Sequence, residues 1–119
     1  MAKELTKQEL HNLAMNVVGK DLEKKGFEFL GVNSDIKANP QFVALKNKKL
    51  HFVVVRAILY PENPKNVDRI YMESMKSHAT KFNAETFYAG VGIANASNYE
   101  LPVTHEENYI INYDGWQEI

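Results

Sequence analysis

The side chains of this sequence that could bind a metal ion or move a proton are its carboxylates and its four histidines. Zinc sites combine histidine, cysteine and carboxylate ligands, often at short helical spacings such as H-x-x-x-H. The histidines, at positions 11, 51, 78 and 105, show no such spacing, and the chain contains no cysteine. Thiolate metal sites, iron–sulfur clusters, disulfides and cysteine nucleophiles are therefore excluded, and we expect neither a metal nor another cofactor. His51 is predicted to face solvent from a strand, and His78 to pack on the inner side of a helix.

Basic residues gather around one predicted turn, at Lys46, Lys48 and Lys49. Lysines at a hairpin tip can contact phosphate, but they also keep a sheet from pairing with another chain at its edge. The formal net charge is -1, from 14 basic and 15 acidic residues, whereas nucleic-acid-binding domains usually carry a basic excess. The composition therefore favours a solvated turn, and contact with nucleic acid remains the alternative.

Helical and strand periodicities divide the first half of the chain. With 119 residues the chain has the length of one domain with a single core, spanning 1–119. The pattern Thr6-x-x-Glu9 is a capping box, and the apolar spacing that follows predicts a helix ending before Gly26. The third of the strands that follow is apolar on both faces, as expected for a central strand. These strands are predicted at 27–32, 41–45 and 50–57.

The second half of the chain is predicted to contain one helix and two strands. Asn66 is expected to cap the helix, which would end near residue 82. Its predicted inner face has helical spacing: Val67, Ile70, Tyr71, Ser74, Met75, His78 and Phe82. Strands are expected at 86–94 and 109–113. The small residues of the former predict a close approach by the second helix: Ala89, Gly90, Gly92 and Ala94.

The order of these elements, with the stretch PQFVALKNKKLHFVVVR at 40–56, resembles the PD-(D/E)XK nuclease superfamily. The similarity covers roughly residues 10–94 and is greatest to small single-domain members related to archaeal Holliday-junction resolvases and restriction endonucleases. It implies a three-layer α/β sandwich of the restriction endonuclease-like type. Its core would be a helix, a three-strand meander, a second helix and a strand, followed here by a C-terminal edge strand.

In that family two carboxylates hold Mg²⁺, and a lysine helps to position or activate water. The corresponding positions are Gln41, Val54 and Arg56, the last two in FVVVR where the family has a pattern like FVEVK. A further acid on the family's first helix would fall near Met15 and Asn16. The Gln amide is a weak ligand, Val is none, and Arg stays protonated and cannot act as a base. The resemblance therefore implies a nuclease-like domain that is not an enzyme.

Three functions follow from these observations. The first is a catalytically inactive nuclease-like domain that binds protein, including a second copy of itself as a homodimer. The second is a nucleic-acid-binding domain that does not cleave. The third is a metal-dependent nuclease with a relocated acidic site. The polar N-terminal stretch and the absence of an apolar run of membrane-spanning length predict a cytoplasmic protein without membrane contact.

Each function has its own candidate residues. Aromatic residues with polar groups are enriched at interfaces. The candidate interface residues are Tyr99, Tyr109, Tyr113 and Trp116. The candidate phosphate contacts are Lys37, Lys46, Lys48, Lys49 and Arg56. The relocated acidic site would combine Asp35 or Glu28 with Glu9 or Glu73.

Overall fold

The first helix, α1 (Lys7–Lys24), begins at the predicted capping box in the computed structural model, which describes residues 3–119. The Glu9 N–H donates to the Thr6 hydroxyl at 3.1 Å, and the Thr6 N–H donates to the Glu9 carboxylate at 2.9 Å. These contacts satisfy backbone donors that the first turn of a helix leaves without partners. The buried side of α1 consists of Leu10, His11, Ala14, Met15, Val18 and Leu22. The predicted apolar stripe is therefore confirmed, with His11 as its one polar member.

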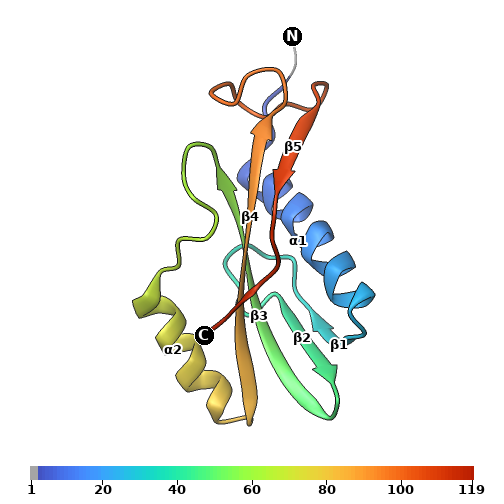
Figure 1. The fold of residues 1–119 in the computed structure, drawn as a ribbon, viewed down its shortest axis with the longest axis vertical. Coiled ribbons are helices and arrows are strands. Elements are labelled where there is room, and N and C mark those ends of the chain that lie inside the picture. The colour runs from blue at the N-terminus through green and yellow to red at the C-terminus, as the bar shows by residue number, and fades with distance from the viewer. Residues whose placement is uncertain (1–2) are drawn as a thin grey trace.

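A mixed sheet forms the centre of the molecule (Figure 1). Its strands are β1 (Glu28–Val32), β2 (Phe42–Lys46), β3 (Lys49–Leu59), β4 (Ala84–Asn95), β5 (Tyr109–Asn112) and β6 (Gln117–Glu118). The first three form an antiparallel meander, β4 runs parallel to β3, and β5 and β6 are antiparallel to β4. All predicted strands are present, β3 and β4 extend beyond their predicted ends, and β6 was not predicted. Asn47 and Lys48 make the β2–β3 turn with positive φ angles, 53° and 65°, as two-residue hairpins require.

The two helices cover opposite faces of the sheet. One face of β3 and β4, with Val53, Val55 and Phe87, packs against α1. The other face, with Val54 and Tyr88, packs against the second helix, α2 (Arg69–Thr80). Figure 1 shows α1 and α2 on either side of the long strands β3 and β4. The prediction that β3 is a central strand covered on both faces is confirmed.

The predicted start of α2 is wrong, and its predicted inner face is right only in part. The helix begins at Arg69, and its N-cap is Asp68, whose carboxylate accepts from the Tyr71 N–H at 3.1 Å. Met72 and Ala79 are its buried residues, whereas Ile70 is 87% exposed. Val67, Tyr71 and Met75 of the predicted face do pack on the sheet, where they lie partly buried around Met72. Phe82 lies beyond the end of the helix.

The predictions for His51 and His78 are also wrong. His51 is buried on the α1 face, edge-on to the Phe27 ring and 4.9 Å from the Phe87 ring centroid. Its Nε2 lies 3.3 Å from the Glu85 carboxylate, which gives it a polar partner. Alternation along a strand assigned it to a solvent face, but α1 and the aromatic residues leave no such face on β3. His78 is exposed, although its ring contacts Phe52 and Phe82.

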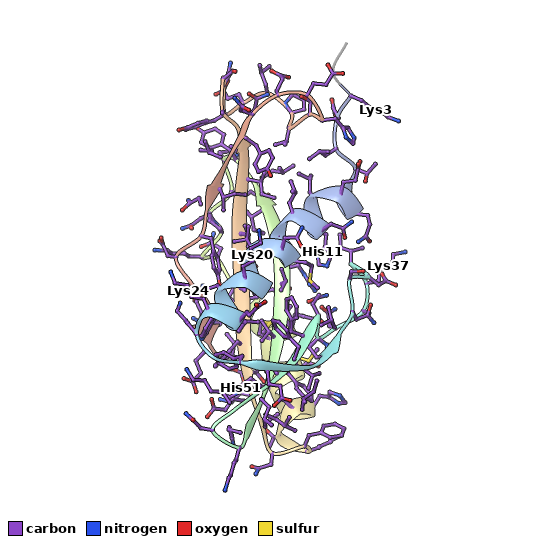
Figure 2. All side chains as sticks on the ribbon, turned by 90° about the vertical axis from the view of Figure 1, so that its right-hand side faces the viewer. Lys3, His11, Lys20, Lys24, Lys37 and His51 are labelled. Carbon is purple, nitrogen blue, oxygen red and sulfur yellow. The ribbon has the colours of Figure 1, made fainter. Side chains whose placement is uncertain are left out.

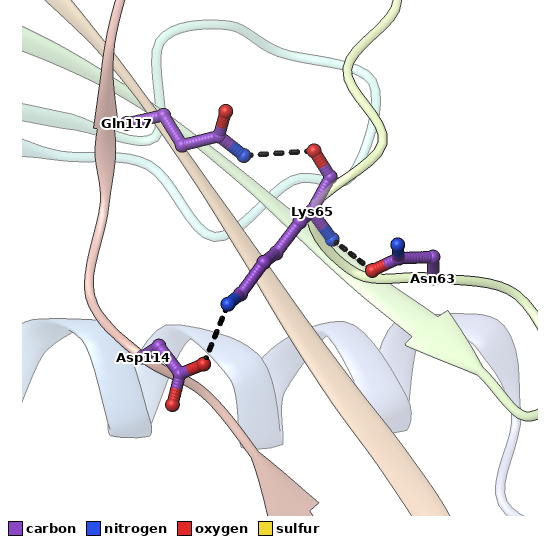
Figure 3. A network of polar contacts seen from close by, with 4 residues as sticks. All are labelled: Asn63, Lys65, Asp114 and Gln117. Carbon is purple, nitrogen blue, oxygen red and sulfur yellow. Dashed lines mark hydrogen bonds and ion pairs between the residues drawn. The ribbon is translucent and has the colours of Figure 1, made fainter.

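The small residues of β4 accommodate the segment before α2 rather than α2 itself. A Cβ at Gly90 would collide with the carbonyl oxygen of Pro64, and one at Gly92 would lie 3.2 Å from the Pro64 ring. Lys65, the next residue, fixes this segment to the C-terminal strand (Figure 3). Its ammonium pairs with Asp114 at 2.9 Å, and its carbonyl accepts from the Gln117 amide at 2.9 Å. The predicted close approach exists, but the approaching element was misidentified.

Replacing Gly90 with alanine is expected to lower the free energy of unfolding by about 1–3 kcal/mol, because backbone must move to make room for the methyl group. Gly31 in β1 is the matched control, since a Cβ there would meet Val43 at an ordinary 3.7 Å. Gly31→Ala should change stability by about 0.5 kcal/mol or less. Urea denaturation of both variants checks this. Equal stability of the two variants would contradict the close approach of Pro64.

Candidate functional site

Gln41, at the first motif position, is a fully buried side chain that joins a loop to the sheet. Its Nε2 donates to the Ala38 carbonyl and, at 2.8 Å, to Asn39 Oδ1. Its Oε1 accepts from the Val55 N–H at 2.8 Å. The Gln41 side chain thus extends the hydrogen-bond ladder between β2 and β3 beyond Phe42, the first residue of β2. The amide oxygen already has a backbone donor, so Gln41 acts here as a structural residue.

Val54 and Arg56 lie further along β3 and differ in accessibility. Val54 has no exposed surface and packs with Met72 and Tyr88. Arg56 is half-buried; its Nη1 donates to Asn39 Oδ1 at 3.0 Å and to the Val55 carbonyl at 2.8 Å. The guanidinium carbon lies 5.6 Å from the centre of the Tyr71 ring. Of the motif positions, Arg56 is therefore the one that reaches a surface pocket.

That pocket has a volume of about 370 Å³ and lies where β3 extends past the end of β2. Its walls come from the N-terminal part of α1, the loop 33–41, the end of β3 and the segment 60–62. A hydrogen bond of 2.7 Å from the Gln8 side chain to the Ser34 carbonyl holds the loop against α1. The lining residues are Lys7, Leu10, His11, Ile36, Arg56, Ala57, Leu59, Tyr60, Pro61 and Glu62.

His11 is the unexpected member of this pocket. The side chain is completely buried, and neither ring nitrogen has a hydrogen-bond partner within residues 3–119. Burial lowers the pKa of His11, the positive charge of Arg56 lowers it further, and Asp35 opposes the shift. The imidazole is therefore neutral at pH 7. Figure 2 labels His11 on α1 and Lys37 on the neighbouring loop.

The predicted phosphate contacts do not converge. Lys48 and Lys49 sit at the β2–β3 turn, and the Lys46 ammonium lies 5.2 Å from the Phe27 ring centre. At about 3.3 Å per residue, the length of β3 separates Lys49 from Arg56 by roughly 20 Å. Lys37 is exposed on the loop beside the pocket. The structure thus places Lys37 and Arg56 near one end of β3 and the turn lysines at the other.

The candidate interface aromatics divide into an exposed pair and a packed pair. Tyr99 and Tyr109 are 49% and 42% exposed. Tyr113 is half-buried, and its hydroxyl donates to Asp21 at 3.1 Å; burial, together with the Asp21 carboxylate, raises the pKa of Tyr113. Trp116 stacks on Phe87 with ring centres 5.3 Å apart. Tyr99 and Tyr109 therefore remain accessible to a partner, whereas the other two extend the core.

The acids considered for a relocated metal site lie on separate elements. Glu9 belongs to the α1 capping box and lies 3.1 Å from His105. Asp35 accepts from the Lys37 N–H at 2.9 Å within the loop. Glu28 is exposed on β1 and Glu73 on α2. In the part of the chain from 3 to 119, no group of three or more such side chains is placed to hold a metal ion.

Comparison with known families assigns the chain to a domain family. A family model described as "Domain of unknown function (DUF8840)" matches residues 8–119. The chain belongs to the DUF8840 family. The match includes the pocket residues His11 and Arg56, the buried Gln41, and the strand β5, so all are parts of the DUF8840 domain. No curated protein and no solved structure matches this DUF8840 chain. None of its helices within 3–119 is sufficiently long and apolar to span a membrane.

Proposed function

We propose that this chain is a catalytically inactive domain of restriction endonuclease-like fold that works by self-association, as a homodimer. The order of elements supports the fold assignment. A helix, an antiparallel meander, a crossover helix and a strand parallel to β3 follow one another, with a helix on each face of the sheet. This is the order and layering expected from the resemblance to PD-(D/E)XK nucleases.

The burial of Gln41 and Val54 supports the absence of catalysis and is the observation that carries this part of the proposal. A hard divalent cation needs anionic oxygen ligands. The Gln41 amide oxygen is bonded to the Val55 N–H, and Val54 offers no ligand atom. Arg56 cannot accept a proton from water, because a guanidinium stays protonated in proteins.

The edge strand β5 supports self-association. Among the strands of residues 3–119, β5 pairs only with β4 and ends the sheet. Its sequence, YIIN, has no charge and no proline, the usual features that protect an edge from pairing. Tyr109, Ile110 and Ile111 are 42%, 38% and 37% exposed. The opposite edge, β1, is interrupted by a bulge between Phe29 and Gly31, which makes it a poorer template.

The backbone direction of β5 defines how a second copy would pair. Ala96 N–H donates to the Asn108 carbonyl at 2.9 Å, so Asn108 bonds toward β4. Because backbone groups alternate along a strand, those of Tyr109 and Ile111 point away from β4. Around a twofold axis at Ile110, Tyr109 of one copy would lie opposite Ile111 of the other. The uncharged, self-complementary strand therefore fits a second copy of this chain.

Replacing Ile111 with proline is expected to weaken the homodimer at least tenfold. Proline removes one outward N–H from each copy, while the bonds between β5 and β4 use other residues. Ile111→Val is the matched control, because it keeps the N–H and most of the apolar surface. Size-exclusion chromatography with light scattering over a concentration series measures the effect, and circular dichroism checks that both variants fold.

A monomeric wild-type chain at high micromolar concentration would overturn the proposed self-association. Equal dimerisation of Ile111→Pro and Ile111→Val would exclude β5 as the interface. Cleavage of DNA or RNA with Mg²⁺ or Mn²⁺, if abolished by Glu9→Gln or Glu73→Gln, would instead support the relocated acidic site.

A further inference from the structure

We propose that the pocket at the end of β3 binds a small organic anion, with a phosphate monoester or carboxylate group held by Arg56, Lys7 and the Ala57 N–H. This inference goes beyond the self-association proposed above and uses a different surface. Its basis is a set of cationic and hydrogen-bond-donor groups that face one cavity and are not paired with an anion.

Arg56 has hydrogen-bonding capacity to spare. A guanidinium carries five N–H donors, and the bonds that it makes to Asn39 and Val55 both use Nη1. Within residues 3–119 neither Arg56 nor Lys7 forms an ion pair. Asn39 and the Val55 carbonyl are neutral acceptors, so the half-buried guanidinium keeps an uncompensated charge, which is costly to bury. An anionic ligand would supply the opposite charge through charge-assisted hydrogen bonds.

The edge of β3 adds a backbone donor. The Val53 carbonyl accepts from the Gln41 N–H at 3.0 Å, and the Val55 N–H donates to Gln41 Oε1. Both groups therefore point toward the β2 side of β3. Ala57 is the next residue in this alternation, and β2 does not extend opposite it. The Ala57 N–H thus faces the pocket that its own side chain lines.

His11 is a titratable group in the pocket wall. The ring lies in this wall with both nitrogens buried and, within residues 3–119, without partners, so a bound anion would act on His11 through its charge. The charged groups around it are Lys7 and Arg56 on the pocket wall, Glu62 on the same wall, and Asp35 on the adjoining loop. Both carboxylates are exposed and lie outside any ion pair with the cations. They leave the cations available to a ligand.

The walls favour a small molecule over a nucleic-acid strand. Leu10, Ile36 and Leu59 line the pocket, and its 370 Å³ falls within the usual range of small-molecule sites, about 300–1,000 Å³. A single strand of nucleic acid would need a basic track with stacking aromatic side chains. The turn lysines that could extend such a track lie at the far end of β3.

Binding should strengthen as the pH falls through the titration range of His11. In the empty pocket burial and Arg56 lower the pKa of His11, whereas a bound anion would raise it. Between the two values the complex takes up a proton that the empty protein does not hold. By linkage, affinity therefore rises toward lower pH over that interval.

Titration with inorganic phosphate, phenyl phosphate and benzoate, followed by NMR of the His11 imidazole and by calorimetry, tests the proposal. Saturable binding is expected, tighter for phenyl phosphate than for inorganic phosphate because of the apolar walls. Arg56→Gln should weaken binding at least tenfold, and Arg56→Lys should weaken it less. Arg69→Gln is the matched control, since Arg69 is exposed on α2 and does not line the pocket. His11→Leu should abolish the pH dependence of benzoate binding, because benzoate, unlike a phosphate, does not itself change charge in this pH range.

Several results would overturn the proposal. These are an absence of saturable binding at millimolar ligand, equal binding by Arg56→Gln and Arg69→Gln, and tighter binding of a single-stranded oligonucleotide through Lys48 and Lys49. Repeating the titration with Ile111→Pro separates the two proposals. Loss of the homodimer should leave phenyl phosphate binding unchanged, because β5 contributes no residue to the pocket.

Discussion

Replacing Val54 with glutamate is expected to lower the free energy of unfolding by about 3–4 kcal/mol at pH 7. The side chain is fully buried between the sheet and α2, against Met72 and Tyr88. Full burial raises the pKa of a carboxyl by about 3–5 units, so the folded state would hold a proton at pH 7. The cost is then about 1.4 kcal/mol for each pH unit between the unfolded pKa of about 4.3 and pH 7.

The pH dependence of the Val54→Glu variant distinguishes the cost of burying a charge from the cost of changing the shape of the side chain. The folded pKa of the introduced carboxyl would be raised above the unfolded value of about 4.3, so the loss of stability grows as pH rises between these values. Below about pH 4 both states are protonated and the loss is smallest. Val54→Thr, with nearly the same shape and no charge, is the matched control. Urea denaturation from pH 3 to pH 8 measures both, and a loss under about 1 kcal/mol at pH 7 would mean that position 54 is hydrated.

The elements of this fold follow from local patterns in the sequence. Local patterns were sufficient to predict α1 and β3. The start of α1 follows from the capping box at Thr6 and Glu9, its buried side from the apolar stripe, and the central place of β3 from its two-sided apolar run. The inner face of α2 followed only in part: Val67, Tyr71 and Met75 pack on the sheet, but the exposed Ile70 and the buried Met72 were not predicted. Met72 over Val54 is a contact between distant segments, which helical spacing alone does not contain.

The candidate site was predicted less completely than the fold. The resemblance located Gln41, Val54 and Arg56, and the two-sided apolar run of β3 predicted that Val54 is buried, but no pattern showed that Gln41 is buried too. The one sequence signal for His11 was its place within the buried stripe of an amphipathic helix. A histidine that is simply packed in the core has the same pattern. Its pocket depends on loop 33–41 and segment 60–62, whose paths no periodicity defines.

Gln41 connects the loop, the sheet and the pocket, and its replacement is the second large expected effect. Gln41→Leu keeps a similar volume but leaves the Val55 N–H and the Ala38 carbonyl without their partners. Each group that loses its partner costs about 1–3 kcal/mol, so the free energy of unfolding should fall by about 2–6 kcal/mol. Asn39 would also lose one bond, and with it part of the support for Arg56.

Gln41→Glu separates the donor role of this side chain from its acceptor role. The variant can still accept from the Val55 N–H, but its second oxygen faces the Ala38 carbonyl and Asn39 Oδ1, which are both acceptors. Repulsion and burial should raise the folded pKa of the new carboxyl, so stability should be lost at pH 7 and partly regained near pH 4. Urea denaturation of both variants at the two pH values measures this. Because Gln41→Leu has no titratable group, a matching regain in that variant, or no loss in either, would contradict the structural role of the Gln41 amide.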